Sequence, residues 1–296
     1  MTDALTVVRS GPLSTVQDLG RAGVAHLGVP RAGALDEPAL RAANRLVGNE
    51  PGAAAVETTL GGIAVRALRP LVVAVTGAPS PVRVDGRPAA WGAPVLVPAG
   101  AVLDVGPATA GVRAYLAAAG GIAVPPVLGS RSADLLSGLG PAPLADGDRL
   151  PVGPRPPLGP APELVPLPAP PTELVLRLRL GPRADWFTPD AAARLARAPY
   201  RVAAASNRIA LRTEGPPLDR AREEELPSEG MVLGAVQVPP DGLPVVFLAD
   251  HPTTGGYPVV GVVPPADLAA AAQARPGTPV RFAVLPGRPA GGGRRE

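Results

Sequence analysis

Proline is spread so densely along this chain that it restricts the fold to short elements. The 296 residues include 42 Pro and 36 Gly. Proline breaks the interior of a helix and cannot donate a hydrogen bond within a central strand, and glycine weakens both kinds of element. Many short strands joined by tight turns fit this pattern better than a helical bundle does.

The densest run of prolines marks a candidate domain boundary. Residues 151–171 contain ten prolines, and such a segment tends to form an extended spacer. We therefore predict an N-terminal domain (1–150), a Pro-rich linker (151–172), a C-terminal domain (173–286) and a disordered tail (287–296). A long surface loop within a single domain remains the alternative for the proline run.

Strand signals fill both halves of the chain. Residues 82–84 lead into Asp85-Gly86, a dipeptide typical of two-residue hairpin turns. Residues 174–180 (LVLRLRL) alternate as a half-buried strand does. Closely spaced strands with turn signals favour a barrel or a sandwich. The other predicted strands are residues 71–75, 94–97, 101–105, 112–118, 232–238, 244–249, 259–263 and 280–284.

Only three short helices are predicted. The first covers residues 36–47, with Asp36 as its N-cap and Gly48 as its C-terminal stop. The second opens at Thr188-Pro189, and the third covers residues 266–274.

Missing residue types exclude several kinds of chemistry. The chain has no Cys and no Lys, so it forms no disulfide, offers no thiol nucleophile and has no lysine for a phosphate-binding loop or for biotin. Its only histidines, His26 and His251, lie outside any H-E-x-x-H pattern, so we expect no metal site.

Charge and hydropathy point to a cytoplasmic protein. The net charge is only +3 and the basic residues are scattered, which argues against nucleic-acid binding. The N-terminus does not resemble a signal peptide, and no apolar run reaches the length of about 18 residues that a membrane span requires.

Five polar, Gly- and Pro-rich segments are candidates for a functional site. They are residues 17–21, 26–33, 128–134, 206–208 and 250–258. Four arginines in them suit bidentate binding of a carboxylate or phosphate, which favours a small anionic substrate. These are Arg21, Arg31, Arg131 and Arg208. Internal ion pairs with nearby aspartates are the alternative for each of them.

The last of these segments has two interpretations. Thr253, Thr254, Gly255 and Gly256, followed by Tyr257, could present hydroxyls and backbone N–H groups to an anion. A plain β-turn that uses the glycines for positive φ fits equally.

His251 and Asp250 are the candidate proton-transfer pair, because histidine titrates near neutrality and a carboxylate can orient it. Neighbours on a strand point to opposite faces, however, so a structural role stays open. His26 is a third candidate catalytic residue. Glu57 lies in an apolar stretch, where it is either paired in the core or directed into a site.

Taken in order, eight segments of the sequence resemble one family. They are residues 15–50, 54–62, 115–122, 127–134, 206–208, 226–230, 234–242 and 249–258. The resemblance is to the family of 5-oxoprolinase C subunits, also described as biotin-dependent-carboxyltransferase-like (allophanate hydrolase subunit 2, KipA). It implies two cyclophilin-like β-barrel domains and two partners, a KipI-like B subunit together with a LamB/YcsF-like A subunit. It also implies that ATP, with Mg²⁺, acts at the level of the complex.

The resemblance leads to three functional hypotheses. The first is the C subunit of an ATP-dependent 5-oxoprolinase, which helps convert 5-oxo-L-proline to L-glutamate. The second is a carboxyltransferase that acts on a small amide, with carboxybiotin supplied by a separate carrier. The third is a non-catalytic regulator that binds a kinase-inhibitor protein.

The sequence departs from the family pattern at three positions in the candidate site. Asn207 stands where the family more often has Asp, Ala210 where it has Gly, and His251 where it has Arg or Gln. Asn207 is therefore included among the candidate substrate-binding residues, and these departures bear on the substrate more than on the fold.

Overall fold

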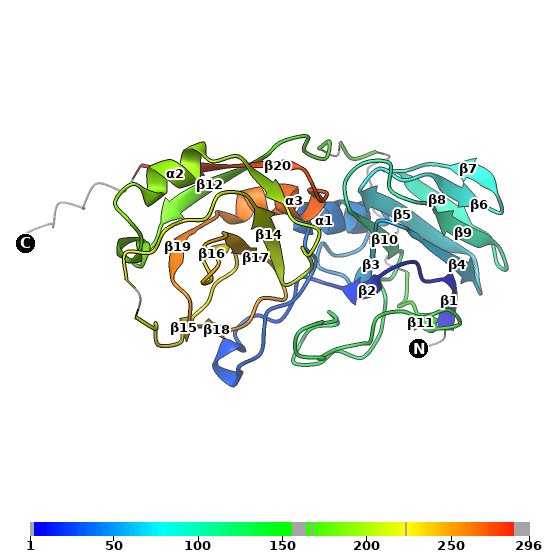
Figure 1. Ribbon diagram of the computed structural model, residues 1–296. Helices are drawn as coiled ribbons and strands as arrows, with labels where there is room; N and C mark the ends of the chain where they lie inside the picture. The colour runs from blue at the N-terminus through cyan, green and yellow to red at the C-terminus, as the bar shows by residue number, and fades with distance from the viewer. Residues whose placement is uncertain (1–2, 156–163, 167, 223, 287–296) are drawn as a thin grey trace, which may run out of the picture.

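The computed structural model describes residues 3–155, 164–166, 168–222 and 224–286. Two β-rich halves lie side by side, and helices α1 (Glu37–Leu46) and α3 (Pro265–Gln273) lie between them (Figure 1). Helix α2 (Ala191–Arg197) lies on the C-terminal half. The predicted mainly β fold with a few short helices is confirmed.

The N-terminal half is built from two antiparallel sheets that enclose one core. The first sheet has the order β11 (Arg149–Pro151), β1 (Asp3–Arg9), β4 (Ile63–Ala67), β9 (Val102–Val105), β6 (Val82–Val84), β7 (Arg87–Ala89). The second has the order β2 (Ser14–Gln17), β3 (Ala55–Thr59), β10 (Arg113–Ala118), β5 (Leu71–Gly77), β8 (Pro94–Val97). Leu5 and Leu103 of the first sheet pack with Val56 and Leu116 of the second.

These two sheets stay open, which differs from the barrel expected in this half. Three of the four edge strands contain a proline: Pro88 in β7, Pro94 in β8 and Pro151 in β11. Proline lacks the N–H group that a further strand would need, so it suits an edge. The described strands of this half therefore form a two-layer arrangement.

Strand β10 is buried on both faces and joins the sandwich to helix α1. Leu116 points into the sandwich core, whereas Tyr115 and Ala117 pack under Leu40 and Leu46 of α1. The helix begins where predicted, because the Asp36 side chain accepts a hydrogen bond from the Ala39 N–H group at 3.0 Å.

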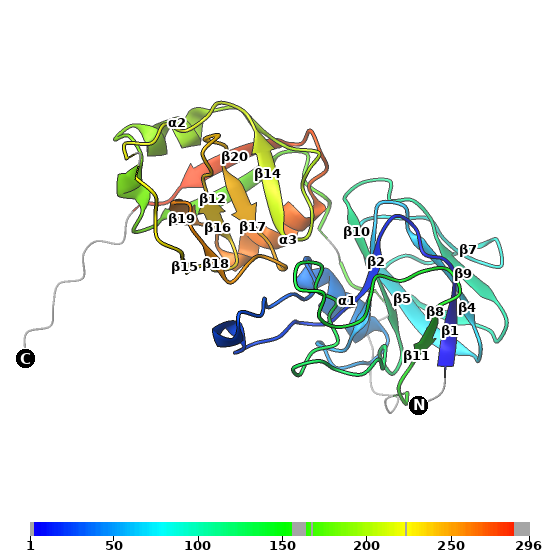
Figure 2. The ribbon, with the colours of Figure 1, turned by 60° about the horizontal axis from the view of Figure 1, so that its bottom comes forward.

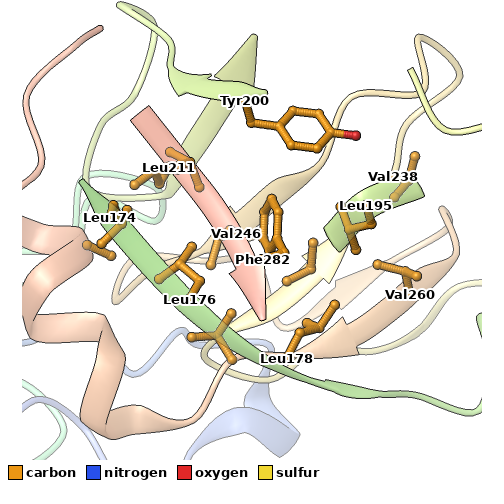
Figure 3. Packing of buried hydrophobic residues seen from close by; sticks show 14 of the residues in the cluster. Leu174, Leu176, Leu178, Leu195, Tyr200, Leu211, Val238, Val246, Val260 and Phe282 are labelled. Carbon is orange, nitrogen blue, oxygen red and sulfur yellow. The ribbon is translucent and has the colours of Figure 1, made fainter. Parts of the chain in front are cut away.

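The C-terminal half forms the predicted closed barrel. Its strand order is β12 (Leu174–Leu180), β19 (Val259–Val262), β16 (Ala235–Gln237), β17 (Val245–Phe247), β14 (Ala210–Glu214), β13 (Tyr200–Val202), β20 (Pro279–Val284). Parallel pairing of β12 with β20 closes the ring. The alternating Leu174, Leu176 and Leu178 point inward, and Tyr200 meets Phe282 edge to face at 5.7 Å between ring centroids (Figure 3).

Each strand predicted from the sequence is found to within three residues, but several others, among them β1 to β4, β13 and β14, were not predicted. The hairpin at Asp85-Gly86 is confirmed, since both residues have left-handed backbone angles (φ 47° and 75°) between β6 and β7. Helix α2 begins at Ala191 and not at Thr188-Pro189. The residues before it are held in extended pairing, where Phe187 bridges to Arg220.

The two halves have separate apolar cores, which supports the proposed division near residue 150. The predicted linker lies partly outside the described residues, and the predicted disordered tail lies wholly outside them. Within the described chain, no helix is long and apolar enough to cross a bilayer.

Candidate functional site

The five candidate segments are brought together where the two halves meet. Arg21 donates from Nε to the carbonyl of Val127 at 3.1 Å, and the Ala32 N–H group donates to the carbonyl of Ala249 at 3.0 Å. Figures 1 and 2 show the segment around η1 (Ala25–Leu27), the loop between β10 and β11 and the short strands β15 (Glu229–Gly230) and β18 (Thr254–Gly255) on one side of the molecule. We call this side the loop face.

Arg208 is the centre of a buried ion cluster that joins the halves. It is 1% exposed, and its Nε and Nη2 bind the two oxygens of Asp250 at 2.9 and 3.0 Å. Its Nη1 pairs with Glu57 of β3, and its Nη2 also donates to the carbonyl of Gly33 at 2.7 Å. Every guanidinium nitrogen of Arg208 is therefore used by protein groups, and this arginine is structural rather than free to bind a substrate.

Glu57 is paired in the core, which settles the alternative left open by the sequence. Its carboxylate accepts hydrogen bonds from the Tyr115 hydroxyl at 2.7 Å and from the Leu35 N–H group at 3.1 Å. Leu35 itself packs into the core of the barrel. The Glu57 carboxylate thus ties strand β3 to a loop whose side chain is buried in the other half.

Burial and charge shift the pKa values of the two carboxylates of this cluster in opposite directions. Burial would raise the pKa of Glu57, but Arg208, Arg113 and the Tyr115 hydroxyl together hold it below its ordinary value. Burial raises the pKa of Asp250, and Arg208 offsets only part of that rise. Both Asp250 oxygens are bound by Arg208, so this carboxylate belongs to the ion cluster.

A small cavity lies between the halves beside this cluster. It has a volume of about 200 Å³, and we call it the seam cavity. Its wall includes Arg113, all three residues of the predicted 206–208 segment and several leucines, among them Leu60 and Leu135. The Leu135 N–H group also donates to Asp250 at 3.3 Å, which places this carboxylate next to the cavity.

Arg113 is a site residue that the sequence interpretation missed. It is buried, its Nη1 donates to the carbonyl of Ala272, and its Nε lies 3.7 Å from Glu57 Oε1. Among the described residues, this buried Nε has no hydrogen-bond partner. The signal that could have identified it is an arginine at the start of an otherwise apolar strand that is buried on both faces.

Asp18 organises the loops next to the cavity. Its carboxylate accepts hydrogen bonds from the hydroxyls of Ser130 and Ser132 at 2.6 Å each, and from the N–H groups of Arg131 at 2.6 Å and Gly20 at 2.8 Å. Burial opposes ionisation, but these four donors hold the pKa of Asp18 below its ordinary value.

The other three predicted arginines differ in their contacts and their burial. Arg21 is buried and donates to the carbonyls of Val127 and Ser132, so it braces two loops. Arg131 donates from Nε to the carbonyl of Val124 at 2.8 Å. Arg31 is half-exposed and pairs with Glu37 at 2.7 Å at the edge of a separate cavity of about 380 Å³. Neither the seam cavity nor that cavity is lined by Arg21 or Arg131.

Asn207 and His26 are both exposed but differ in their surroundings. Asn207 lines the seam cavity, yet its carbonyl oxygen accepts from the Ile209 and Ala210 N–H groups at 2.8 and 3.2 Å, as a turn-forming asparagine does. His26 lies on η1, at the tip of a loop that the Arg21 N–H to Arg31 carbonyl hydrogen bond closes. It does not line the seam cavity.

The segment from Thr253 to Tyr257 is a strand and not a glycine turn. Thr254 and Gly255 form β18, and neither Gly255 nor Gly256 has a positive φ, so the turn interpretation is wrong. A Cβ atom on Gly255 would lie 2.7 Å from Gln237 Nε2, so close packing explains this glycine. Tyr257 is exposed and lies under the Arg220 guanidinium at 5.8 Å.

His251 and Asp250 do not form a hydrogen-bonded pair. His251 Nδ1 lies 2.7 Å from the carbonyl of Pro252, and the ring stacks on Phe247 at 5.9 Å between centroids. Burial lowers the pKa of His251, so the ring is neutral at pH 7. A carbonyl only accepts, so the proton resides on Nδ1 and Nε2 keeps its lone pair.

We expect acidification to destabilise the protein through His251. In the unfolded chain this histidine binds a proton near pH 6.5, whereas the folded protein binds it only at lower pH. Stability is therefore lost as pH falls from about 6.5 through the folded pKa. In urea unfolding, the free energy of unfolding should fall less between pH 7.5 and pH 5 for His251→Gln than for the wild type. Equal losses would refute this, and His26→Gln is the matched control.

Gly140 lets the loop between β10 and β11 approach Arg21. Its φ is 83°, and a Cβ atom would clash with the carbonyl of Ser132 and lie 2.8 Å from Arg21 Nη2. Gly129 in the same loop has φ 80° with nothing near its Cβ position. Gly140→Ala should therefore lower the free energy of unfolding by about 2 kcal/mol more than Gly129→Ala, which adds only the left-handed strain of about 1 kcal/mol. Equal losses in urea unfolding would show that the clash is absorbed.

In the part of the chain that the structure describes, no group of three or more His, Asp or Glu side chains is placed to hold a metal ion. Arg113 lines the seam cavity, whereas the predicted proton-transfer residues Asp250 and His251 do not. A guanidinium group in this wall suits anion binding.

Comparison with known families gives a match over most of the chain. Residues 27–284 match the family described as "Carboxyltransferase domain, subdomain A and B". The chain is 40% identical over 286 residues to the C subunit of 5-oxoprolinase from Escherichia coli, covering 94% of this chain and 90% of that protein. It is 33% identical to the 5-oxoprolinase C subunit from Haemophilus influenzae, covering 92% and 88%.

Larger relatives contain the same fold as a part. Urea amidolyase of Saccharomyces cerevisiae is 32% identical over 95% of this chain, which spans 17% of that protein. The solved structure of TTHA0988 superposes with a TM-score of 0.86 at 40% identity, over 95% of this chain and 56% of that chain. Kluyveromyces lactis urea carboxylase gives a TM-score of 0.84 at 30% identity, over 94% and 27%.

Proposed function

This chain belongs to the family of carboxyltransferase domains, subdomains A and B, that includes the 5-oxoprolinase C subunits, and from that premise we propose that it is the C subunit of an ATP-dependent 5-oxoprolinase. In this proposal it works in the cytoplasm with a KipI-like B subunit together with a LamB/YcsF-like A subunit. The complex converts 5-oxo-L-proline to L-glutamate.

The observation that carries the proposal is the extent of the match. The chain spans 90% and 88% of two separate C subunits but only 17% of the urea amidolyase of Saccharomyces cerevisiae. Identity to the E. coli protein, at 40%, also exceeds the 32% to that amidolyase.

The seam cavity supports a small anionic substrate. A volume of about 200 Å³ is below the 300–1,000 Å³ of pockets for drug-sized ligands, and it suits a compact lactam acid such as 5-oxoproline. In the proposed arrangement the Arg113 guanidinium binds the substrate carboxylate. Asp250 and His251 do not line this cavity, so no proton-transfer step is assigned to them there.

The same volume does not fit a nucleotide, and the chain has no lysine for a phosphate-binding loop. We therefore propose that ATP binds elsewhere in the complex, and we assign this chain no step through it. Biotin likewise has no lysine to which it could be attached here.

The reconstituted complex tests both the reaction and the site. Glutamate should form from 5-oxo-L-proline and ATP only when the A and B subunits are combined with this chain. No glutamate from an intact complex would refute the proposal.

We expect Arg113→Met to lower kcat/KM of that complex by roughly 100-fold, because a desolvated charge-assisted hydrogen bond to the substrate is lost. Arg275→Met is the matched control. Arg275 also bridges the halves, through the carbonyls of Gly111 at 2.7 Å and Ala108 at 2.6 Å, but it does not line the seam cavity. Equal losses in both variants would mean that Arg113 acts only on the fold.

A second candidate is carboxyl transfer to a small amide. It is favoured by the match of 95% of this chain to urea amidolyase and by the carboxyltransferase family itself. A biotinylated carrier that loses its carboxyl group to urea only in the presence of this chain would support it.

A further inference from the structure

Large apolar side chains are exposed on the loop face, where the candidate segments gather. Six of them lie on four loops: Leu27, Leu128, Leu135, Leu136, Val232 and Tyr257. Leu27 is 58% exposed and Val232 is 53% exposed. Soluble proteins rarely leave such side chains grouped in water unless the surface binds something.

Hydrogen bonds between the loops make them one surface. Arg21 joins the loop of Leu27 to the loop of Leu128, since its Nε donates to the Val127 carbonyl. The Leu135 N–H group joins the loop of Leu128 to Asp250. The Met231 N–H group donates to the Thr253 carbonyl at 2.8 Å, which joins the loop of Val232 to the segment before Tyr257. The two views agree in placing these loops next to one another (Figures 1 and 2).

Leu128 is held outward in a conformation that leucine rarely adopts. Leu128 and Gly129 form the two central residues of a tight turn, closed by pairing of Val127 with Ser130. Their φ values are 50° and 80°, and such turns favour Asn-Gly. A leucine that is 47% exposed at this position gains nothing from the fold of its own chain.

One relative contains further chain beyond this fold. TTHA0988 contains this whole fold within 56% of its length, so more than two fifths of that chain lies outside it. The chain described here also matches C subunits that are separate polypeptides, over 90% of the E. coli protein. A protein module that is continuous with this fold in one relative is thus a natural separate partner in another.

We propose that the loop face is the docking surface for a separate protein partner, whose apolar side chains cover these six residues. The partner is the counterpart of the part of TTHA0988 that lies beyond this fold. Leu135 lines the seam cavity as well as the loop face, so the docked partner lies at the mouth of that cavity. The identity of this partner as the KipI-like B subunit rests on the proposed function.

The test measures binding and activity separately. The full chain and a variant with Leu27→Ser, Leu128→Asn and Leu136→Ser are titrated by calorimetry with the KipI-like B subunit. Leu128→Asn suits the turn, so the variant should keep its unfolding midpoint while its Kd weakens by roughly 100-fold, as expected when anchor residues of an interface are removed.

Leu96→Ser is the matched control, because Leu96 is 66% exposed on β8, away from the loop face (Figure 1). Its Kd should stay within about twofold of the wild type. Wild-type affinity of the triple variant would overturn the proposal. So would a wild-type chain that self-associates through this face, measured by sedimentation, because the occupant would then be a second copy.

The glutamate assay is read on the same samples. A complex that forms through the loop face but makes no glutamate leaves the docking proposal standing and refutes the proposed function. A complex that makes glutamate and still forms with the triple variant refutes the docking proposal and supports the proposed function.

Discussion

Replacing Arg208 with Met is expected to lower the free energy of unfolding by about 3–5 kcal/mol, because it leaves the buried carboxylates of Glu57 and Asp250 without their shared cation. Burial alone disfavours both charges. The loss should be smaller when Glu57→Gln accompanies Arg208→Met than the sum of the two single changes, since the residues belong to one cluster.

The two tryptophans allow the unfolding of each half of the molecule to be followed separately. Trp91 lies in the N-terminal half and Trp186 packs in the core of the barrel. In urea unfolding of single-tryptophan variants, the wild-type halves should unfold together, whereas Arg208→Met should separate the two transitions. Arg201→Met, on the exposed side of β13, is the control and should change stability by less than about 0.5 kcal/mol. A change of similar size in both variants would contradict the role of the cluster.

Asp18→Ala is expected to lower the free energy of unfolding by about 3 kcal/mol, because it leaves four buried or half-buried donors without their acceptor. Asp18→Asn should also destabilise, because the new amide group meets an N–H or O–H donor in either orientation. Hydrogen exchange at Gly20 and Arg131 should accelerate in both variants. Asp241→Asn is the control, since Asp241 accepts only from the Leu243 N–H group in an exposed turn.

The contribution of Asp18 depends on pH with a defined sign. Its folded pKa lies below its ordinary value of 3.8, so its stabilisation is fully present above that value. Stability is lost as pH falls through the folded pKa. The free energy of unfolding of Asp18→Asn should therefore depend less on pH in this range than that of the wild type. An unchanged acid transition would show that another carboxyl controls it.

Local sequence signals predicted part of the secondary structure, because the causes of those elements are local. The alternation of residues 174–180 predicted β12, Asp85-Gly86 predicted a hairpin, and Asp36 predicted the start of α1. Each depends on side-chain periodicity, backbone preference or a cap within a few residues. Hydrogen bonds link several of the five candidate segments near the junction of the halves, and their role as one functional site stays a prediction.

The roles of single residues in the site could not be predicted in the same way. Arg208 appeared free to bind a substrate, but Glu57, 151 positions earlier, and Asp250 use its nitrogens. Arg113 was missed although its side chain lines the seam cavity and its Nε has no hydrogen-bond partner among the described residues. Whether an arginine is satisfied depends on partners that only the packing of the two halves supplies.

The sequence by itself determined a mainly β chain of short strands, because propensity and periodicity act over a few residues. The barrel was implied only by the family resemblance. Only the tertiary structure decided which charges are paired and which face a cavity. It also decided that the N-terminal sheets stay open and that six apolar side chains share one exposed face. Those outcomes depend on contacts between residues more than a hundred positions apart, which local patterns do not encode.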